Sequence, residues 1–199
     1  MFKGDFTLED AEAYGLLVEN LHAVQNALAS MTMDREAIDG FAEDLARWSE
    51  RLEQSAGDEQ HQVNGRVAEL PVRGHAMLPA LRVTSRTDDR VEGTVRFGRW
   101  FMGGGMAAHG GAVSLLFDEV LGILASLAAG GITRTAFLHT DYRALTPIDE
   151  DLDVVAWVDR VEGRKWFVRG EIRRGGVVCA EGEGLFLRLL PDQGLGKRA

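Results

Sequence analysis

The sequence has few of the features that mark secreted, membrane or nucleic-acid-binding proteins. It contains one cysteine, Cys179, so no internal disulfide can form, and this fits a reducing compartment. The first residues carry acidic side chains and lack the apolar core of a signal peptide, which predicts a cytoplasmic protein. Asp118 and Glu119 interrupt the longest apolar stretch, so we expect no membrane span.

Basic charge is scarce in the first part of the chain. Residues 1–60 carry 14 acidic and 4 basic side chains, whereas residues 61–199 carry 17 and 18. A nucleic-acid-binding surface would need a strongly basic stripe, so we expect no nucleic-acid partner. The glycines at 103–105 lack the spacing of a dinucleotide-binding motif and are interpreted as a flexible loop.

Two amphipathic helices are predicted before residue 60. Apolar side chains recur at helical spacing over residues 8–30 and again over residues 34–55, where Asp34 is a candidate N-cap. The polar segment 56–66 has the composition of a linker. We therefore expect an acidic helical extension, residues 1–60, folded as a hairpin on the main domain. Its acidity fits a solvated face, and a protein-interaction module is the alternative.

The rest of the chain predicts one domain of class α+β, residues 67–191. A single long apolar helix is expected between strands, followed by four strands joined by short turns. Such an order favours an antiparallel sheet with the helix packed on one face. The predicted strands are residues 81–87, 92–99, 134–145, 151–162, 165–174 and 177–190.

The central helix carries a carboxylate in apolar surroundings. Residues 112–129 contain only four polar side chains: Ser114, Asp118, Glu119 and Ser126. A helix that is apolar on nearly every side is buried, and burying a carboxylate is costly. We therefore expect Asp118 to be kept for chemistry. The alternative is a partly exposed polar edge of a core helix.

His109, Gly110 and Gly111 stand immediately before this helix. Glycine lets another group approach the backbone, and the unpaired N–H groups of a helix start attract a polarised carbonyl. Asp118 lies about 10 Å along the axis from Gly111, so the two cannot reach one carbonyl within a single chain. A second subunit would have to supply one of them. A histidine at this place is more often a helix cap than a catalyst.

Three segments resemble one enzyme family. HGGAVSLLFDEVLG resembles the HGG-x6-D signature of hotdog-fold thioesterases of the phenylacetate-pathway type. GGITRTAFLHTDYRALTPI and DRVEGRKWFVRGEI follow in the same order and spacing as in the acyl-CoA thioesterases called thioesterase superfamily members. Within those, the chain is most similar to the subgroup that contains the carboxyl-terminal modulator protein. The resemblance covers about residues 75–190.

The resemblance implies a hotdog fold, an antiparallel sheet wrapped around one long helix, with active sites between two subunits of a homodimer or a dimer of dimers. It implies hydrolysis of acyl-CoA to a fatty acid and coenzyme A, with no metal and no cofactor beyond the coenzyme A of the substrate. By position, Asp118 matches the catalytic aspartate, acting as general base or nucleophile. Gly110 matches the glycine whose amide polarises the thioester carbonyl, and Thr135 matches the hydroxyl residue that places water.

One departure concerns the loop before the glycines. Some relatives carry an asparagine about six residues before the histidine, whereas FMGGGMAA contains neither asparagine nor glutamine. We expect His109 or a loop backbone group to take over that role, with the Gly111 amide beside Gly110 at the carbonyl.

The phosphates of coenzyme A need cations near the mouth of the site. We predict Arg164 and Lys165 for this role first, and Arg173 and Arg174 next, with solvated turn charges as the alternative for each. Two other functions stay open: an enoyl-CoA hydratase or dehydratase, whose motif is not apparent, and a non-catalytic acyl-CoA-binding regulator, against which the intact Asp118 speaks. The acyl chain and the carrier, coenzyme A or acyl carrier protein, are not specified by the sequence.

Overall fold

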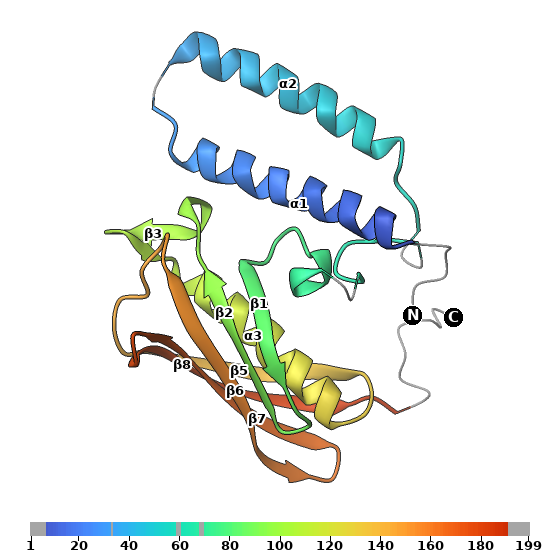
Figure 1. Ribbon diagram of the computed structural model, residues 1–199, viewed down its shortest axis with the longest axis vertical. Coiled ribbons are helices and arrows are strands. Elements are labelled where there is room, and N and C mark those ends of the chain that lie inside the picture. The colour runs from blue at the N-terminus through green and yellow to red at the C-terminus, as the bar shows by residue number, and fades with distance from the viewer. Residues whose placement is uncertain (1–6, 33, 59–60, 68–69, 191–199) are drawn as a thin grey trace. The chain divides into compact units, whose positions relative to one another are not determined.

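The structure is a computed structural model that describes residues 7–32, 34–58, 61–67 and 70–190. The chain divides into two compact units, Met1–Ala76 and Met77–Ala199 (Figure 1). Each unit is described by itself below. The predicted packing of the helical extension on the main domain therefore stays a prediction.

The first unit contains the two predicted helices, α1 (Leu8–Ala29) and α2 (Arg35–Glu53), followed by a short 3-10 helix, η1 (Pro71–Gly74). Thr7 caps α1, and its side chain and backbone exchange hydrogen bonds with Asp10 in a capping box. Asp34 caps α2 by accepting a hydrogen bond from the Ala37 amide, which confirms the predicted N-cap.

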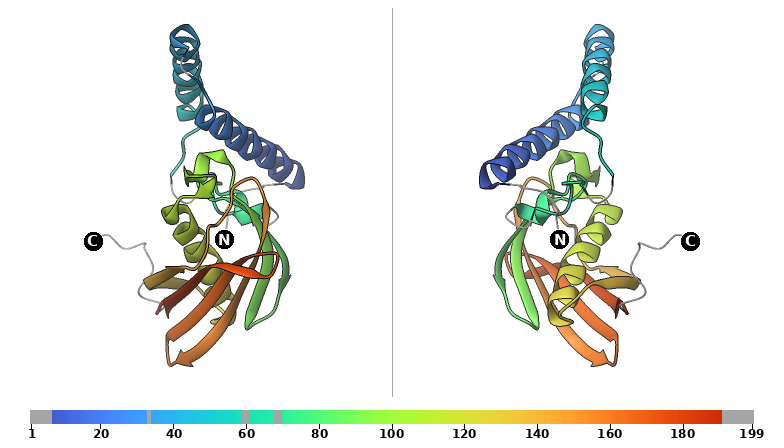
Figure 2. Two further views of the ribbon diagram at one scale, coloured as in Figure 1. Left: turned by 90° about the vertical axis from the view of Figure 1, so that its left-hand side faces the viewer. Right: turned by 90° about the vertical axis from the view of Figure 1, so that its right-hand side faces the viewer.

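The second unit is a six-stranded antiparallel sheet that curves around one helix (Figure 2). The strands lie in the order β1-β2-β6-β7-β8-β5, so β5 forms one free edge. An antiparallel sheet wrapped around a long helix is the hotdog fold, as the resemblance implied. The elements are β1 (Ala80–Arg86), β2 (Arg90–Arg96), α3 (Gly110–Ala128), β5 (Thr133–Tyr142), β6 (Asp151–Glu162), β7 (Lys165–Arg174) and β8 (Val177–Arg188).

The segment before α3 differs from the prediction. Instead of a flexible loop it forms a short 3-10 helix, η2 (Arg99–Phe101), and a small hairpin, β3 (Met102–Gly104) and β4 (Ala107–Ala108). Gly105 and Met106 make the turn with φ of 57° and 62°. Two successive positive φ values are the geometry of a two-residue type I′ hairpin turn, and Gly105 adopts its positive φ without strain.

Helix α3 lies close to the sheet because glycines on the sheet leave room for its side chains. Gly170 on β7 and Gly182 on β8 are cross-strand partners. A Cβ at Gly182 would lie 2.6 Å from the ring of Phe117, and a Cβ at Gly170 would lie 3.0 Å from Leu121. Phe117 and Leu121 are fully buried, so the glycines set the distance between helix and sheet.

Replacing Gly182 by alanine should therefore destabilise the second unit by about 1–3 kcal/mol, since Phe117 would have to leave its position. The measurement is urea unfolding followed by far-UV circular dichroism. Gly131→Ala is the matched control, because a Cβ there would meet Arg188 at an ordinary 3.6 Å. An equal loss of stability in both variants would contradict the close-approach argument. Adding Phe117→Leu to Gly182→Ala should recover part of the loss.

Among the described residues, α3 is the helix whose length and composition would allow it to cross a membrane. In this fold it is the core helix, with contacts to β2, β5, β6, β7 and β8. Its side chains Leu116, Val120 and Leu124 are completely buried. The expectation that no segment spans a membrane stays a prediction.

Candidate active site

The start of α3 offers one open backbone amide. His109 is the N-cap residue, and its Nδ1 accepts a hydrogen bond of 3.0 Å from the Gly111 amide. The Gly111 amide is therefore occupied, which removes it from the predicted pair of carbonyl-binding amides. Within the described residues, the Gly110 amide has no acceptor. Gly110 is thus the donor available to a ligand at this helix start, where the helix dipole favours negative charge.

Three hydroxyl groups fix the first turns of α3 to β5. Tyr142 donates a hydrogen bond of 2.8 Å to the Gly110 carbonyl, and its hydroxyl lies 3.1 Å from the hydroxyl of Ser114. Ser114 in turn donates to Thr140 at 3.1 Å. The sequence analysis missed Tyr142 and Thr140. Their spacing was the available signal. Thr140 and Tyr142 are two residues apart on β5, and residues two apart on a strand point to the same face of the sheet.

Asp118 and Thr135, which the resemblance assigns to one site, contact each other. The Thr135 hydroxyl donates a hydrogen bond of 2.8 Å to Asp118 Oδ1, which leaves Oδ2 open to another donor. The expectation that Asp118 is buried is wrong for the single chain, because its side chain is exposed. The reason is the position of β5: it is an edge strand, so no further strand covers the flank of α3 that carries Asp118.

The open amide and the carboxylate occupy two separate positions along the α3–β5 seam. Gly110 and Asp118 are eight residues apart on one helix, which corresponds to about 12 Å along the axis. Near the first position Ser114 contacts Thr140, and at the second Asp118 contacts Thr135. Both positions lie beside the free edge of the sheet. These two positions are called the candidate half-sites below: the Gly110 half-site and the Asp118 half-site.

Comparison with known proteins finds similarity over the part of the chain that contains these residues. Residues 106–180, which include both half-sites, match the family model of the Thioesterase superfamily. The acyl-coenzyme A thioesterase THEM4 of Bos taurus is 30% identical over 87 residues, and that of Rattus norvegicus is 33% identical over 89 residues. These alignments cover 43% and 44% of this chain but only 35% and 38% of the relatives, so the chain spans little more than a third of their length.

Solved structures support the fold of the second unit. A thioesterase superfamily protein superimposes with a TM-score of 0.75 and 28% identity, covering 87% of this chain and 94% of that one. The zebrafish Thioesterase Superfamily Member 2 superimposes with a TM-score of 0.52 and 18% identity, covering 55% of this chain and 81% of its own. The second comparison shows a shared fold alone.

The four predicted phosphate-binding cations do not form one group. Arg164 and Lys165 lie at the turn between β6 and β7, whereas Arg173 and Arg174 lie at the opposite end of β7, about 30 Å away. Arg174 is held by Glu150 through two hydrogen bonds of 2.7 Å. Arg173 likewise contacts a neighbouring glutamate. Among the described residues, Lys165 has no acidic partner.

Strand pairing shows which cations adjoin which half-site. Thr135 pairs with Phe186, and Phe186 pairs with Trp166, so the Thr135 end of β5 is the Lys165 end of β7. By the same ladder, the Tyr142 end of β5 is the Arg173 end of β7.

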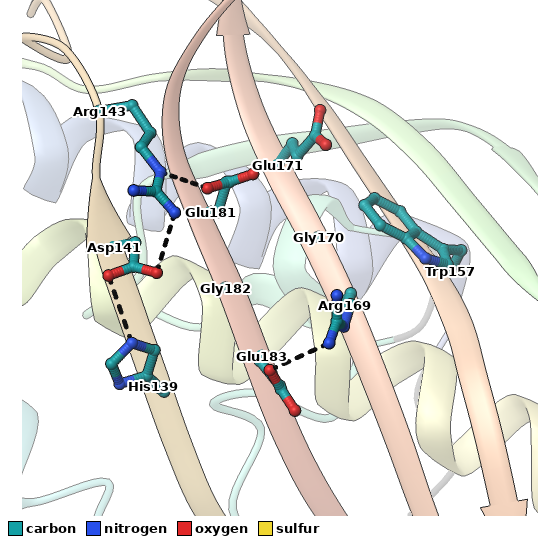
Figure 3. Close-up of a pocket in the computed structure, with 10 residues that line it drawn as sticks. All are labelled: His139, Asp141, Arg143, Trp157, Arg169, Gly170, Glu171, Glu181, Gly182 and Glu183. Carbon is teal, nitrogen blue, oxygen red and sulfur yellow. Dashed lines mark hydrogen bonds and ion pairs between the residues drawn. The ribbon is translucent and has the colours of Figure 1, made fainter.

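The face of the sheet turned away from α3 carries a charged groove of about 260 Å³ (Figure 3). Its side chains neutralise one another: Arg143 contacts Glu181 and Asp141, while Arg169 contacts Glu183 at 3.4 Å. This groove shares no residue with either half-site. In the part of the chain that is described, no three side chains of the metal-binding types gather closely enough to hold a metal ion.

Proposed function

We propose that this protein is an acyl-CoA thioesterase that works as a homodimer, releasing a free fatty acid and coenzyme A. The observation that carries the proposal is the Thr135–Asp118 hydrogen bond of 2.8 Å on the same helix edge as the open Gly110 amide. A carboxylate next to a hydroxyl, together with an oxyanion donor, supplies the catalytic groups that thioester hydrolysis needs. The name of the THEM4 relatives, acyl-coenzyme A thioesterase, supports the substrate class.

In the proposed mechanism, the thioester carbonyl accepts a hydrogen bond from the Gly110 amide of one subunit. Negative charge that develops on its oxygen is then stabilised by that amide and by the N-terminus of α3. Asp118 of the other subunit takes a proton from the attacking water; the C–S bond then breaks, and the leaving coenzyme A thiolate takes up that proton. Alternatively, Asp118 attacks the carbonyl itself, the C–S bond breaks to release the thiolate, and water opens the resulting anhydride to give the free acid and the original carboxylate. Thr135 holds Oδ1 of the carboxylate, so Oδ2 faces the water. The Nδ1 atom of His109 is engaged as the helix cap, so only its Nε2 can contact the substrate.

The homodimer is supported by the free edge of the sheet. Strand β5 has an unpaired side, and Phe137 on it is 42% exposed. Such an edge pairs readily with a second strand. An antiparallel pair of two β5 strands that crosses at the strand centre places the Thr135 end of one against the Tyr142 end of the other. Each Asp118 then lies beside the Gly110 of the second copy, and a dimer of dimers would retain this pair.

The coenzyme A phosphates would bind to Arg164 and Lys165, since Lys165 is unpaired in the described chain. Arg173 and Arg174 adjoin the other half-site. They would bind the phosphates only after their contacts with Glu171 and Glu150 are broken. We further propose that the protein is cytoplasmic, acts in fatty acid metabolism, spans no membrane, binds no nucleic acid, and needs no cofactor beyond the coenzyme A of its substrate.

The experiment that tests this function is a thiol-release assay of the purified protein on a series of saturated acyl-CoA substrates, with enoyl-CoA hydration assayed in parallel. We expect thiol release whose kcat/KM changes with chain length. Hydration without thiol release would overturn the proposal in favour of a hydratase. Tight acyl-CoA binding without either reaction would replace it with a regulatory role.

Changing Tyr142 to phenylalanine should lower kcat for thioester hydrolysis by about 3- to 10-fold, which is the equivalent of one neutral hydrogen bond. The lost bond fixes the first turn of α3, and with it the Gly110 amide. KM and the melting temperature should change little. Thr140→Val is the matched control, because it removes a hydroxyl that contacts Ser114 but not Gly110. A Tyr142→Phe variant with unchanged kcat would show that this hydroxyl does not position the amide.

A further inference from the structure

Helix α2 carries an apolar seam that its own unit leaves uncovered. Ile38, Phe41, Leu45, Trp48 and Leu52 follow one another at alternating intervals of three and four residues. This is the a/d spacing of a helix that pairs with another helix. No residue of α2 is buried, and Phe41, Leu45 and Leu52 are 56%, 42% and 47% exposed. These five residues are called the α2 seam below.

Helix α1 does not close the α2 seam. An open groove of about 450 Å³ runs between the two helices, with an apolar floor formed by Val24, Leu45 and Trp48. Val24 is itself 40% exposed. The rim is charged and consists of Asp44, Arg47 and Arg51. An apolar floor with a charged rim fits the side of an amphipathic helix.

The charges beside the seam are those of a self-complementary surface. Asp44 and Arg51 lie one heptad apart on the same side of the seam, both at g positions. Among the described residues, Arg51 has no acidic partner, whereas Asp44 contacts Arg47 on its own helix. On the other side of the seam, the e positions are occupied by the small residues Ala42 and Ser49. Small residues on one side of the seam let a second helix approach closely. Opposite charges on the other side favour one direction of that helix, parallel or antiparallel, over the other.

We propose that α2 pairs with α2 of a second copy of this chain in an antiparallel arrangement. In this register Phe41 packs against Leu52 of the second copy, and Leu45 packs against Trp48 of the second copy. The two-fold axis repeats both layers, and Asp44 of each copy lies beside Arg51 of the other. The arrangement covers the seam and gives Arg51 an acidic neighbour, while Asp44 can keep its contact with Arg47. It does so although residues 1–60 are acidic as a whole. The proposal does not depend on the thioesterase function.

Disulfide cross-linking of the full-length chain tests the pairing. In the variant Asp44→Cys/Arg51→Cys, the two cysteines of one chain are about 10 Å apart along the helix, beyond the reach of a disulfide. In the antiparallel pair, the cysteine at position 44 of each copy faces the cysteine at position 51 of the other copy. We expect oxidation to give a covalent dimer on a non-reducing gel, whereas Asp44→Cys alone stays monomeric. The natural Cys179 is 1% exposed and does not compete.

Two further substitutions in the cross-linking variant check that the seam drives the pairing. Leu45→Asp places a charge in the seam and should reduce the yield of covalent dimer at least 10-fold. Glu50→Gln, on the opposite side of α2, is the matched control and should leave the yield unchanged. Absence of a covalent dimer from the double-cysteine variant would overturn the proposal and assign the seam to another surface. Equal cross-linking by Asp44→Cys alone would overturn the antiparallel arrangement.

Discussion

Replacing Asp118 by asparagine should lower kcat/KM for acyl-CoA hydrolysis by about 10²- to 10⁴-fold, the contribution of a general base. Asparagine keeps an oxygen that can accept the Thr135 hydrogen bond, so the local geometry survives while the basic carboxylate is lost. Because the side chain is exposed, the free energy of unfolding should change by no more than about 0.5 kcal/mol. The measurement is steady-state thiol release together with thermal unfolding of both proteins.

Glu119→Gln is the matched control for Asp118→Asn. It removes a carboxylate one residue further along the same helix, on a side chain that the proposed mechanism does not use. Its activity should stay within about 2-fold of the unmodified protein, which is the size of ordinary surface effects. If Asp118→Asn retained full turnover, or if both variants lost activity equally, Asp118 would not be the catalytic carboxylate.

Replacing Gly110 by proline should lower kcat/KM by about 10²- to 10³-fold, because proline removes the amide that stabilises the oxyanion. Proline suits this site in other respects. Gly110 is the first residue of α3, where proline is favoured, and His109 has the extended φ and ψ of −61° and 136° that precede a proline.

Gly110→Ala isolates the contribution of the amide. A Cβ at position 110 would lie 3.0 Å from the Tyr142 hydroxyl in both variants, but only alanine keeps the N–H group. We expect the alanine variant to lose less than about 10-fold in kcat/KM, well short of an oxyanion-donor effect. Equal losses in the two variants would mean that crowding of Tyr142, and not the missing donor, explains the result.

Mixing the two inactive proteins tests whether the half-sites are shared. When Asp118→Asn and Gly110→Pro chains are unfolded together and refolded at equal amounts, random pairing makes half of the dimers mixed. Each mixed dimer holds one site with both groups intact, so about a quarter of the original activity should return. If each chain contained a complete site, the mixture would be no more active than its parents.

Local sequence patterns predicted the elements of the fold well. Helices over residues 8–30 and 34–55 and the strands after residue 150 were found because their apolar periods depend only on neighbouring side chains. The β3–β4 hairpin was missed because three glycines read as a flexible loop. The turn instead uses Met106 at a positive φ, a conformation that methionine rarely adopts.

The candidate site was predicted in part. The match of Asp118 and Thr135 came from the resemblance, and their hydrogen bond agrees with it. The sequence analysis gave a helix cap as the commoner role of a histidine at position 109, and the structure shows that cap. Which glycine amide it occupies depends on the rotamer of His109. Tyr142 was overlooked because a tyrosine 32 residues from Gly110 gives no local signal of the contact.

The sequence by itself predicted the two N-terminal helices, the central helix and the six strands of the large sheet, and that Gly110 and Asp118 lie too far apart on one helix to share a carbonyl. Helical rise is a local property, so spacing alone was sufficient for that conclusion. Only the tertiary structure decided that Asp118 is exposed at a sheet edge and that Tyr142 fixes the first turn of α3. These facts depend on the order of strands and on contacts between distant segments, which no local pattern encodes.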